Sequence, residues 1–210
     1  DDWLDRAALA EVLATLRGFR ADDHAVDLLV SNFVYEKVGK KNKTAVRYGG
    51  GALPKGRVLT WSQTRRFAKR QYLMMHALTY RTAVLREAGL RLPEHTFYVD
   101  NLYALVPLAK VRTLFYLDVD LYRYFIGRED QSVQEAVMLR RLDQQLRVNW
   151  MMLEHVSRTP PVHDLRLRRY LLHYVEIICA VSSILLIRAG TPASLAEKDR
   201  LWSRLRAHDP

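Results

Sequence analysis

The chain has 210 residues, of which 49% are hydrophobic, so it can bury a core as one domain or as a domain with a helical extension. Its 33 lysines and arginines against 23 aspartates and glutamates give a formal charge of +10. Such a charge is typical of chains that bind nucleic acid, an anionic membrane surface or a phosphorylated ligand, and the basic clusters also fit solvated helix faces and loops. The only cysteine is Cys179, which excludes an internal disulfide framework and is typical of the cytoplasm.

A helix and a strand are expected first. Asp5 can cap a helix over residues 6–17, with apolar residues at helical spacing and Gly18 as its stop. Residues 26–35 are rich in Val, Leu and Phe, which predicts a strand that reaches the core.

A glycine-rich region follows the first strand. Residues 44–48 and 57–59 flank two glycine-containing segments, whose backbone can move at little steric cost. Two interpretations stay open: a loose hairpin that closes over substrate, and a disordered connector.

Two short helices are expected before residue 90. A capping box that starts at Thr60 opens the first, and Thr79 can cap the second over residues 80–88. Between them lies His76, in a run rich in aromatic residues and methionine. Such a histidine either packs in the core or donates a hydrogen bond to a ligand.

The middle of the chain places Asp100 between an aromatic run and a helix expected over residues 101–109. Two β-rich runs, 114–117 and 121–125, then lead into a polar loop over residues 127–132. A carboxylate at the start of a helix, beside aromatic residues and a basic loop, can activate a hydroxyl group next to a phosphate.

The last third predicts helices. A capping box at Ser132 opens a helix over residues 133–156, a second helix follows Asp164 and ends at Gly190, and the last begins at Thr191.

The most apolar run, residues 170–187, is the one stretch long enough to consider as a membrane span. It contains His173 and Glu176 and follows three arginines, and a hydrocarbon layer disfavours such groups. A buried helix is therefore the favoured interpretation.

Several short motifs occur in a distinctive order. In chain order they are Tyr80-Arg81-Thr82, Leu92-Pro93-Glu94, Tyr98-Val99-Asp100-Asn101, Leu117-Asp118, Tyr122-Arg123-Tyr124, Gly127-Arg128 and Gln131-Ser132-Val133. Their order and spacing resemble the acceptor-side half of family 2 glycosyltransferases, which are inverting nucleotide-sugar enzymes of the GT-A fold. The resemblance implies an α/β chain: a truncated GT-A-like half over residues 1–131, followed by a C-terminal helical bundle over residues 132–210.

The resemblance implies that Asp100 is the catalytic base, which takes the proton from the acceptor hydroxyl. Val99 stands where the family often has a glutamate, so one acidic partner is missing. From the residues alone, Asp100 also fits the N-cap of the helix that follows, and the two roles are compatible. On the acceptor side, the resemblance places His76 and Tyr98.

Donor phosphates are expected near Arg123, Arg128, Gln131 and Ser132, in the region that closes over the donor in the family. A helix N-terminus at Ser132 favours anions, and arginine adds paired donors. The same residues also fit an ordinary surface turn and a helix cap.

The first residues, Asp1-Asp2-Trp3-Leu4-Asp5, are similar to the end of the acidic metal-binding motif of that family. Asp1 would then be the second aspartate of an Asp-X-Asp pair whose first member lies upstream. Asp1 and Asp2 would hold Mg²⁺ or Mn²⁺ in the intact protein.

The resemblance thus implies a fragment of a glycosyltransferase that moves a sugar, with inversion, from a nucleotide-sugar donor to a carbohydrate or lipid-linked acceptor in cell-surface polysaccharide synthesis. We expect it in the cytoplasm or at the inner face of the membrane as a peripheral protein, without nucleic acid as partner. These residues alone are expected to be inactive, because the nucleotide-binding half is missing. The alternative is a non-catalytic basic helical module for nucleic acid or an anionic membrane, with Tyr98 and Asp100 purely structural.

Overall fold

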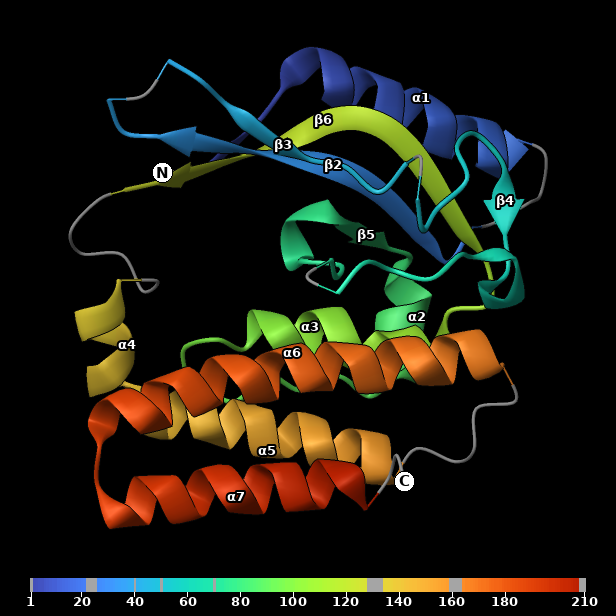
Figure 1. Ribbon diagram of the computed structural model, residues 1–210. Helices are drawn as coiled ribbons and strands as arrows, with labels where there is room; N and C mark the ends of the chain where they lie inside the picture. The colour runs from blue at the N-terminus through green and yellow to red at the C-terminus, as the bar shows by residue number, and fades with distance from the viewer. Residues whose placement is uncertain are drawn as a thin grey trace. The chain divides into compact units, whose positions relative to one another are not determined.

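The computed structural model describes residues 2–21, 26–39, 41–49, 51–69, 71–127, 134–158 and 164–207 (Figure 1). They form an α/β protein with a mixed sheet and α-helices, which confirms the predicted class. The chain divides into a sheet unit, Asp1–Gly89 with Lys110–Arg128, and a helical unit, Leu90–Ala109 with Glu129–Pro210. This division differs from the expected one between residues 131 and 132, because Leu90–Ala109 groups with the C-terminal helices.

Two parallel strands form the centre of the sheet unit, β2 (Leu28–Lys37) and β6 (Leu114–Ile126). The first three residues of β2, Leu28 to Val30, are buried and apolar, as expected for a strand covered on both faces. The pairing register shifts on either side of Asn32, where β6 carries extra residues. The strand predicted over residues 26–35 is confirmed, whereas the two runs predicted after residue 114 are one continuous strand that is bulged between them.

Asp27 ties the two central strands together where they begin. Its buried carboxylate accepts hydrogen bonds from the backbone N–H groups of Arg112 (2.8 Å) and Thr113 (3.2 Å). Arg81 adds a charged donor, with Nη2 2.6 Å from Oδ1. A buried carboxylate is tolerated when donors surround it in this way, so the contact joins the start of β2 to the start of β6 and to the end of β5.

The remaining strands attach to the central pair on its two outer edges. Antiparallel partners of β6 are β1 (Trp3–Leu4) and β4 (Val58–Leu59), and those of β2 are β3 (Thr44–Val46) and β5 (Leu78–Tyr80). The hairpin expected from residues 44–48 and 57–59 is therefore wrong, since each segment pairs with a different central strand. The expected helix over residues 80–88 is shorter, α2 (Thr82–Glu87), because its first residue completes β5.

Helix α1 (Arg6–Ala21) packs on the central strands through an apolar cluster. Its buried residues Ala8 and Val12 lie against Leu29 and Phe115. The predicted cap is present, since Asp5 Oδ1 accepts a hydrogen bond from the Ala8 N–H at 3.1 Å. The helix continues past Gly18, because its packing against β6 outweighs the weak helix preference of that glycine.

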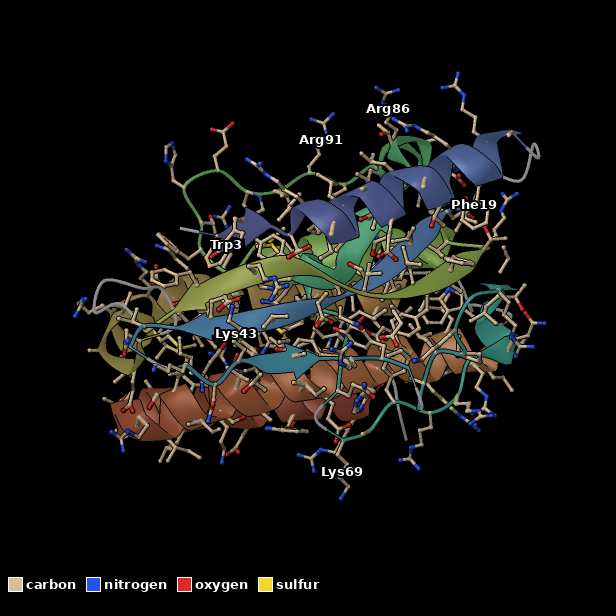
Figure 2. All side chains as sticks on the ribbon, turned by 90° about the horizontal axis from the view of Figure 1, so that it is seen from above. Trp3, Phe19, Lys43, Lys69, Arg86 and Arg91 are labelled. Atoms are coloured by element: carbon tan, nitrogen blue, oxygen red, sulfur yellow. The ribbon has the colours of Figure 1, made fainter. Side chains whose placement is uncertain are left out.

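Two aromatic pairs, one near each end of α1, link this helix to the two ends of β6. Figure 2 shows Trp3 near the beginning and Phe19 near the end of α1. The Trp3 ring centroid lies 6.4 Å from that of Phe125, and the Phe19 centroid lies 4.9 Å from that of Phe115, edge to face. Such pairs contribute about 0.5–1.5 kcal/mol beyond their buried area, so they help to align α1 along the strand.

Two single turns of 3₁₀ helix occur where the sequence is rich in aromatic residues, η1 (Trp61–Gln63) and η2 (Met75–Ala77). The capping box predicted at Thr60 is present, with the Thr60 N–H 2.9 Å from Gln63 Oε1. The helix it was expected to open ends after one turn.

The helical unit contains α3 (Asp100–Leu105) with the 3₁₀ turn η3 (Val106–Lys110), α4 (Glu135–Arg140), α5 (Leu142–Arg158), α6 (Leu165–Ala189) and α7 (Pro192–Arg206). Helix α6 packs against both α5 and α7, and α3 packs against α5. The single helix predicted over residues 133–156 is divided at Arg141. The predicted start at Asp164 is confirmed, since its carboxylate accepts from the Arg166 N–H at 2.8 Å.

Helix α6 is long and apolar enough to cross a membrane by length and composition, yet 61% of its most apolar window is buried inside the structure. The buried side includes polar groups that bond to α5. Ser182 Oγ accepts hydrogen bonds from Gln145 Nε2 at 3.1 Å and from Asn149 Nδ2 at 2.9 Å. The burial and this polar contact are the pattern of a core helix, in line with the favoured interpretation.

Replacement of glycine by alanine is expected to change the free energy of unfolding in opposite directions at Gly18, inside α1, and at Gly190, just after α6. Gly190 has a φ of 69°, so Gly190→Ala places a side chain in a left-handed conformation and is expected to lower the free energy of unfolding by about 1 kcal/mol. Gly18 lies within a right-handed helix with no atom within 4 Å of an added Cβ, so Gly18→Ala is expected to raise it by about 0.5–1 kcal/mol. Urea denaturation of both variants measures this, and two changes of the same sign would contradict either the left-handed conformation of Gly190 or the helical conformation of Gly18.

Candidate functional site

Asp100, the predicted base, is the first residue of α3 and is half-buried. Burial raises the pKa of its carboxyl group, against the opposing effect of hydrogen bonds from the backbone N–H groups of Asp100 and Asn101. The N-cap position belongs to Val99, so Asp100 is not the N-cap that the sequence also allowed. Its carboxylate is therefore more basic than that of an ordinary aspartate, as general bases in active sites are.

The segment before Asp100 has an unusual backbone. His95 and Tyr98 have φ values of 50° and 68°, in the left-handed region that residues other than glycine rarely adopt. Each such residue costs about 1–3 kcal/mol and persists only where its surroundings hold it. Strain of this kind collects at functional sites, and here it lies directly before the predicted base.

Helix α5 and Arg141, the residue just before it, hold this strained segment through polar and cation–π contacts. The Phe97 N–H donates to Gln144 Oε1 at 2.8 Å, and Arg147 Nη1 donates to Thr96 Oγ1 at 3.3 Å. The Arg141 guanidinium carbon lies 3.5 Å from the centroid of the Phe97 ring. The segment is thus bound along its length to α5 and to the residue that precedes this helix.

Tyr98, predicted on the acceptor side, lies beside Asp100 in the helical unit. Burial raises the pKa of its phenol, Arg141 lowers it, and the Asp100 charge raises it further. The structure therefore brings these two predicted residues together.

His76, the other predicted acceptor residue, is buried in the sheet unit among aromatic rings. It stacks on Tyr124 with centroids 4.3 Å apart, and the centroids of Tyr122 and Phe33 lie at 4.9 Å and 5.2 Å. Burial lowers its pKa to about 4, with a small opposing effect of Asp2. Its Nδ1 atom has no hydrogen-bond partner among the described residues. His76 is thus packed in the core, which is one of the two interpretations that the sequence allowed, and a contact with a ligand stays a prediction.

Arg123, predicted to bind donor phosphates, is engaged by carboxylates. Its Nη2 lies 3.1 Å from Asp5 Oδ2, and its Nη1 lies 3.3 Å from Glu36 Oε1. Glu36 also binds Lys43 Nζ at 2.9 Å, which extends the series of ion pairs. A phosphate at Arg123 would have to replace these carboxylates, so that role stays a prediction.

Asp2, predicted to bind metal, uses both carboxylate oxygens within the sheet unit. Oδ2 accepts from the Tyr122 hydroxyl at 2.8 Å and Oδ1 accepts from the Phe125 N–H at 2.9 Å. The described part of the chain contains no group of three or more His, Cys, Asp or Glu side chains that could hold a metal. These residues by themselves do not fit a divalent cation. The other predicted ligands, Asp1 for metal and Arg128, Gln131 and Ser132 for phosphate, lie outside the described residues.

A polar cluster that the sequence analysis did not single out lies where β6 is bulged. Asn32 Nδ2 donates to Asp118 Oδ1 at 2.8 Å and to Asp120 Oδ1 at 3.0 Å. Arg47 pairs with both aspartates, at 3.3 Å and 2.7 Å, and Lys55 pairs with Asp118. The Lys55 and Asn32 hydrogen bonds hold the pKa of Asp118 far below its usual range. The Asp-X-Asp spacing within a β-rich run was the signal in the sequence that could have indicated this cluster.

The cluster holds the glycine-rich loop against β6. The Gly56 N–H donates to the Tyr116 carbonyl oxygen at 3.2 Å, and Tyr48 is fully buried. A Cβ on Gly49 would lie 2.8 Å from a Tyr116 ring carbon, so glycine is required there for the close approach. The disordered connector expected as one alternative is therefore wrong for the described part of this loop, which is anchored.

Comparison of the chain with protein-family models, with curated proteins and with solved structures gave no match. The functional argument therefore depends on the residues of the chain and on the geometry given above.

The buried imidazole of His76 predicts a loss of stability in acid. The unfolded chain binds a proton near pH 6.5, whereas the folded protein does so only near its pKa of about 4. Lowering the pH through this window therefore reduces the free energy of unfolding, by roughly 3 kcal/mol in total. His76→Phe keeps a stacked ring and removes the titration. Urea denaturation at several pH values should show the wild type losing stability relative to the variant below pH 6.5, and parallel pH curves would contradict the burial of a neutral imidazole.

Proposed function

We propose that this chain is the acceptor-side part of an inverting nucleotide-sugar glycosyltransferase, with Asp100 as the base. The observation that carries the proposal is the environment of Asp100: a half-buried carboxyl group at a helix start, with a raised pKa, directly after a strained backbone segment. The order of motifs along the chain supports the same enzyme class.

In the proposed reaction, the acceptor hydroxyl oxygen forms a bond to the anomeric carbon while the bond from that carbon to the diphosphate oxygen breaks. The hydroxyl proton passes to the Asp100 carboxylate, and the nucleoside diphosphate leaves with the bonding electrons. A base works best when its pKa is near the working pH, and burial moves the pKa of Asp100 in that direction. Tyr98, next to the carboxylate, is the aromatic residue that the resemblance places on the acceptor side.

The donor and its cation belong to the intact protein in this proposal. We assign no step to Mg²⁺ or Mn²⁺, because the described residues do not form a site for one. The acceptor is a carbohydrate or a lipid-linked sugar of cell-surface polysaccharide synthesis, and the enzyme works in the cytoplasm or at the inner face of the membrane. These assignments follow the motif resemblance.

A second candidate, from a different class, is a non-catalytic basic module. Two neighbouring apolar side chains at the end of α6, Ile184 and Ile187, are 62% and 55% exposed and lie beside Arg188. Exposed apolar residues next to basic ones favour an anionic membrane surface over nucleic acid as the partner of such a module.

Asp100→Asn tests the enzyme directly in the intact protein. We expect sugar transfer to fall by roughly a hundredfold or more, because the amide cannot accept the proton, while nucleotide affinity stays near that of the wild type. Asp143→Asn is the matched control, an exposed aspartate in the first turn of α5, and should leave transfer unchanged. Unchanged turnover in Asp100→Asn would remove Asp100 from the mechanism.

Vesicle sedimentation tests the second candidate. A basic membrane module should bind phosphatidylcholine vesicles only when they contain phosphatidylglycerol, and added salt should release it. Replacing Ile184 and Ile187 together by serine should weaken binding, whereas Val38→Ser, an exposed apolar residue of the sheet unit, should not. Equal binding to neutral and anionic vesicles would contradict this candidate, and so would salt-sensitive binding to duplex DNA without any to vesicles.

A further inference from the structure

The Asn101 side chain connects the strained segment to helix α6. Its Nδ2 donates to the Tyr98 carbonyl oxygen at 3.0 Å, and its Oδ1 accepts from the Tyr174 hydroxyl at 3.2 Å. Asn101 and Tyr174 are both buried. A flipped amide would place its own oxygen against the Tyr98 carbonyl oxygen, so the two bonds together select one orientation.

The Tyr98 carbonyl is the point at which this contact acts on the backbone. It accepts a second hydrogen bond, from the Asn101 N–H at 3.2 Å. Tyr98 has a φ of 68°, which a tyrosine adopts only when its neighbours hold it there. Because Tyr98 sets the direction in which the chain enters α3, the same contacts set where the Asp100 carboxylate lies, two residues later.

Tyr174 is a rigid anchor for this contact. Its side chain is 1% exposed and lies within the length of α6, a 25-residue helix that packs against α5. The segment before Asp100 is bound to α5 as well, through the hydrogen bond from the Phe97 N–H to Gln144. Two packed helices therefore determine the conformation of one short turn.

We propose that Asn101 and Tyr174 are positioning residues for Asp100, through which helix α6 keeps the carboxylate half-buried at the start of α3. The role of Asp100 as a base rests on the function proposed above, and the inference adds to it the residues that place this carboxylate. Neither Asn101 nor Tyr174 takes part in proton transfer itself. The C-terminal helices are on this account part of the catalytic apparatus rather than a separate extension.

Tyr174→Phe removes one hydroxyl group and leaves the aromatic ring in place. We expect the Tyr98 segment to relax and the Asp100 carboxylate to gain water, so that its pKa falls toward the ordinary aspartate value. The measurement is a ¹³C NMR titration of the Asp100 carboxyl carbon in the chain described here, with Asp100→Asn to assign the signal. Asn101→Ala, which removes both contacts, should lower the pKa at least as far and serves if Tyr174→Phe does not fold.

Ser182→Ala is the matched control on the same helix. It removes a buried hydroxyl group whose hydrogen bonds to Gln145 and Asn149 run to α5 rather than to α3. All three variants should unfold at lower urea concentration than the wild type, but only Tyr174→Phe and Asn101→Ala should change the Asp100 titration. An unchanged titration in both of these variants would overturn the inference and leave the two residues with a structural role alone.

The two proposals fail in distinguishable ways. If transfer by the intact enzyme survives Asp100→Asn, the proposed function is lost, although the titration can still show that Asn101 and Tyr174 position the carboxylate. If transfer is lost in Asp100→Asn while Tyr174→Phe changes neither the titration nor kcat, the enzyme stands and the positioning role is lost. Where both hold, kcat of Tyr174→Phe should fall about tenfold with the KM for the nucleotide sugar unchanged, since the misplaced group is the base.

Discussion

The parallel pairing of β2 with β6 is the constraint on which the sheet unit depends. Parallel strands cannot be joined by a tight turn, so the chain between them must make a long crossover. That crossover contains β3, β4 and β5, each paired to a central strand, and Leu90–Ala109, which joins the helical unit. The Asp27 carboxylate holds the beginning of the pair through Arg81 and two backbone N–H groups. Without this contact the backbone N–H groups of the two residues before β6 would lose their acceptor in a part-buried place.

The crossover also explains why the proposed base belongs to the helices. Asp100 enters α3 after a turn with two left-handed residues, and the contacts that hold this turn come from α5 and α6. The sheet unit carries a different set of polar groups, in which carboxylates are already paired with Arg123, Arg47 and Lys55. For Asp100, in contrast, burial has the largest effect: it raises the pKa of the carboxyl group and leaves that group more basic. This difference in environment is the physical basis for choosing Asp100 among the acidic residues.

Local signals in the sequence predicted helix ends well. Asp5 and Asp164 cap the helices expected of them, and Gly190 ends α6 with a left-handed φ of 69°, because a cap or stop depends on a few neighbouring residues. Predictions failed where distant pairing decides the outcome. The segments around residues 44 and 58 were read as one hairpin because they are close in sequence, yet each finds a free edge of a different central strand. The break expected within β6 is a bulge, which the Asn32 side chain fills by bonding to both aspartates.

The sequence by itself determined the α/β class, the helix caps at Asp5, Asp164 and Thr191, and the choice of Asp100 as a residue to consider, since these follow from composition, periodicity and short motifs. Only the tertiary structure decided that Asp100 groups with the C-terminal helices, that His76 is neutral and packed among rings, and that Asn101 is held between Tyr98 and Tyr174. The reason is that burial, and with it the direction of a pKa shift, depends on side chains brought together from distant parts of the chain. Asn101 and Tyr174 are separated by 73 positions, and no local pattern could pair them.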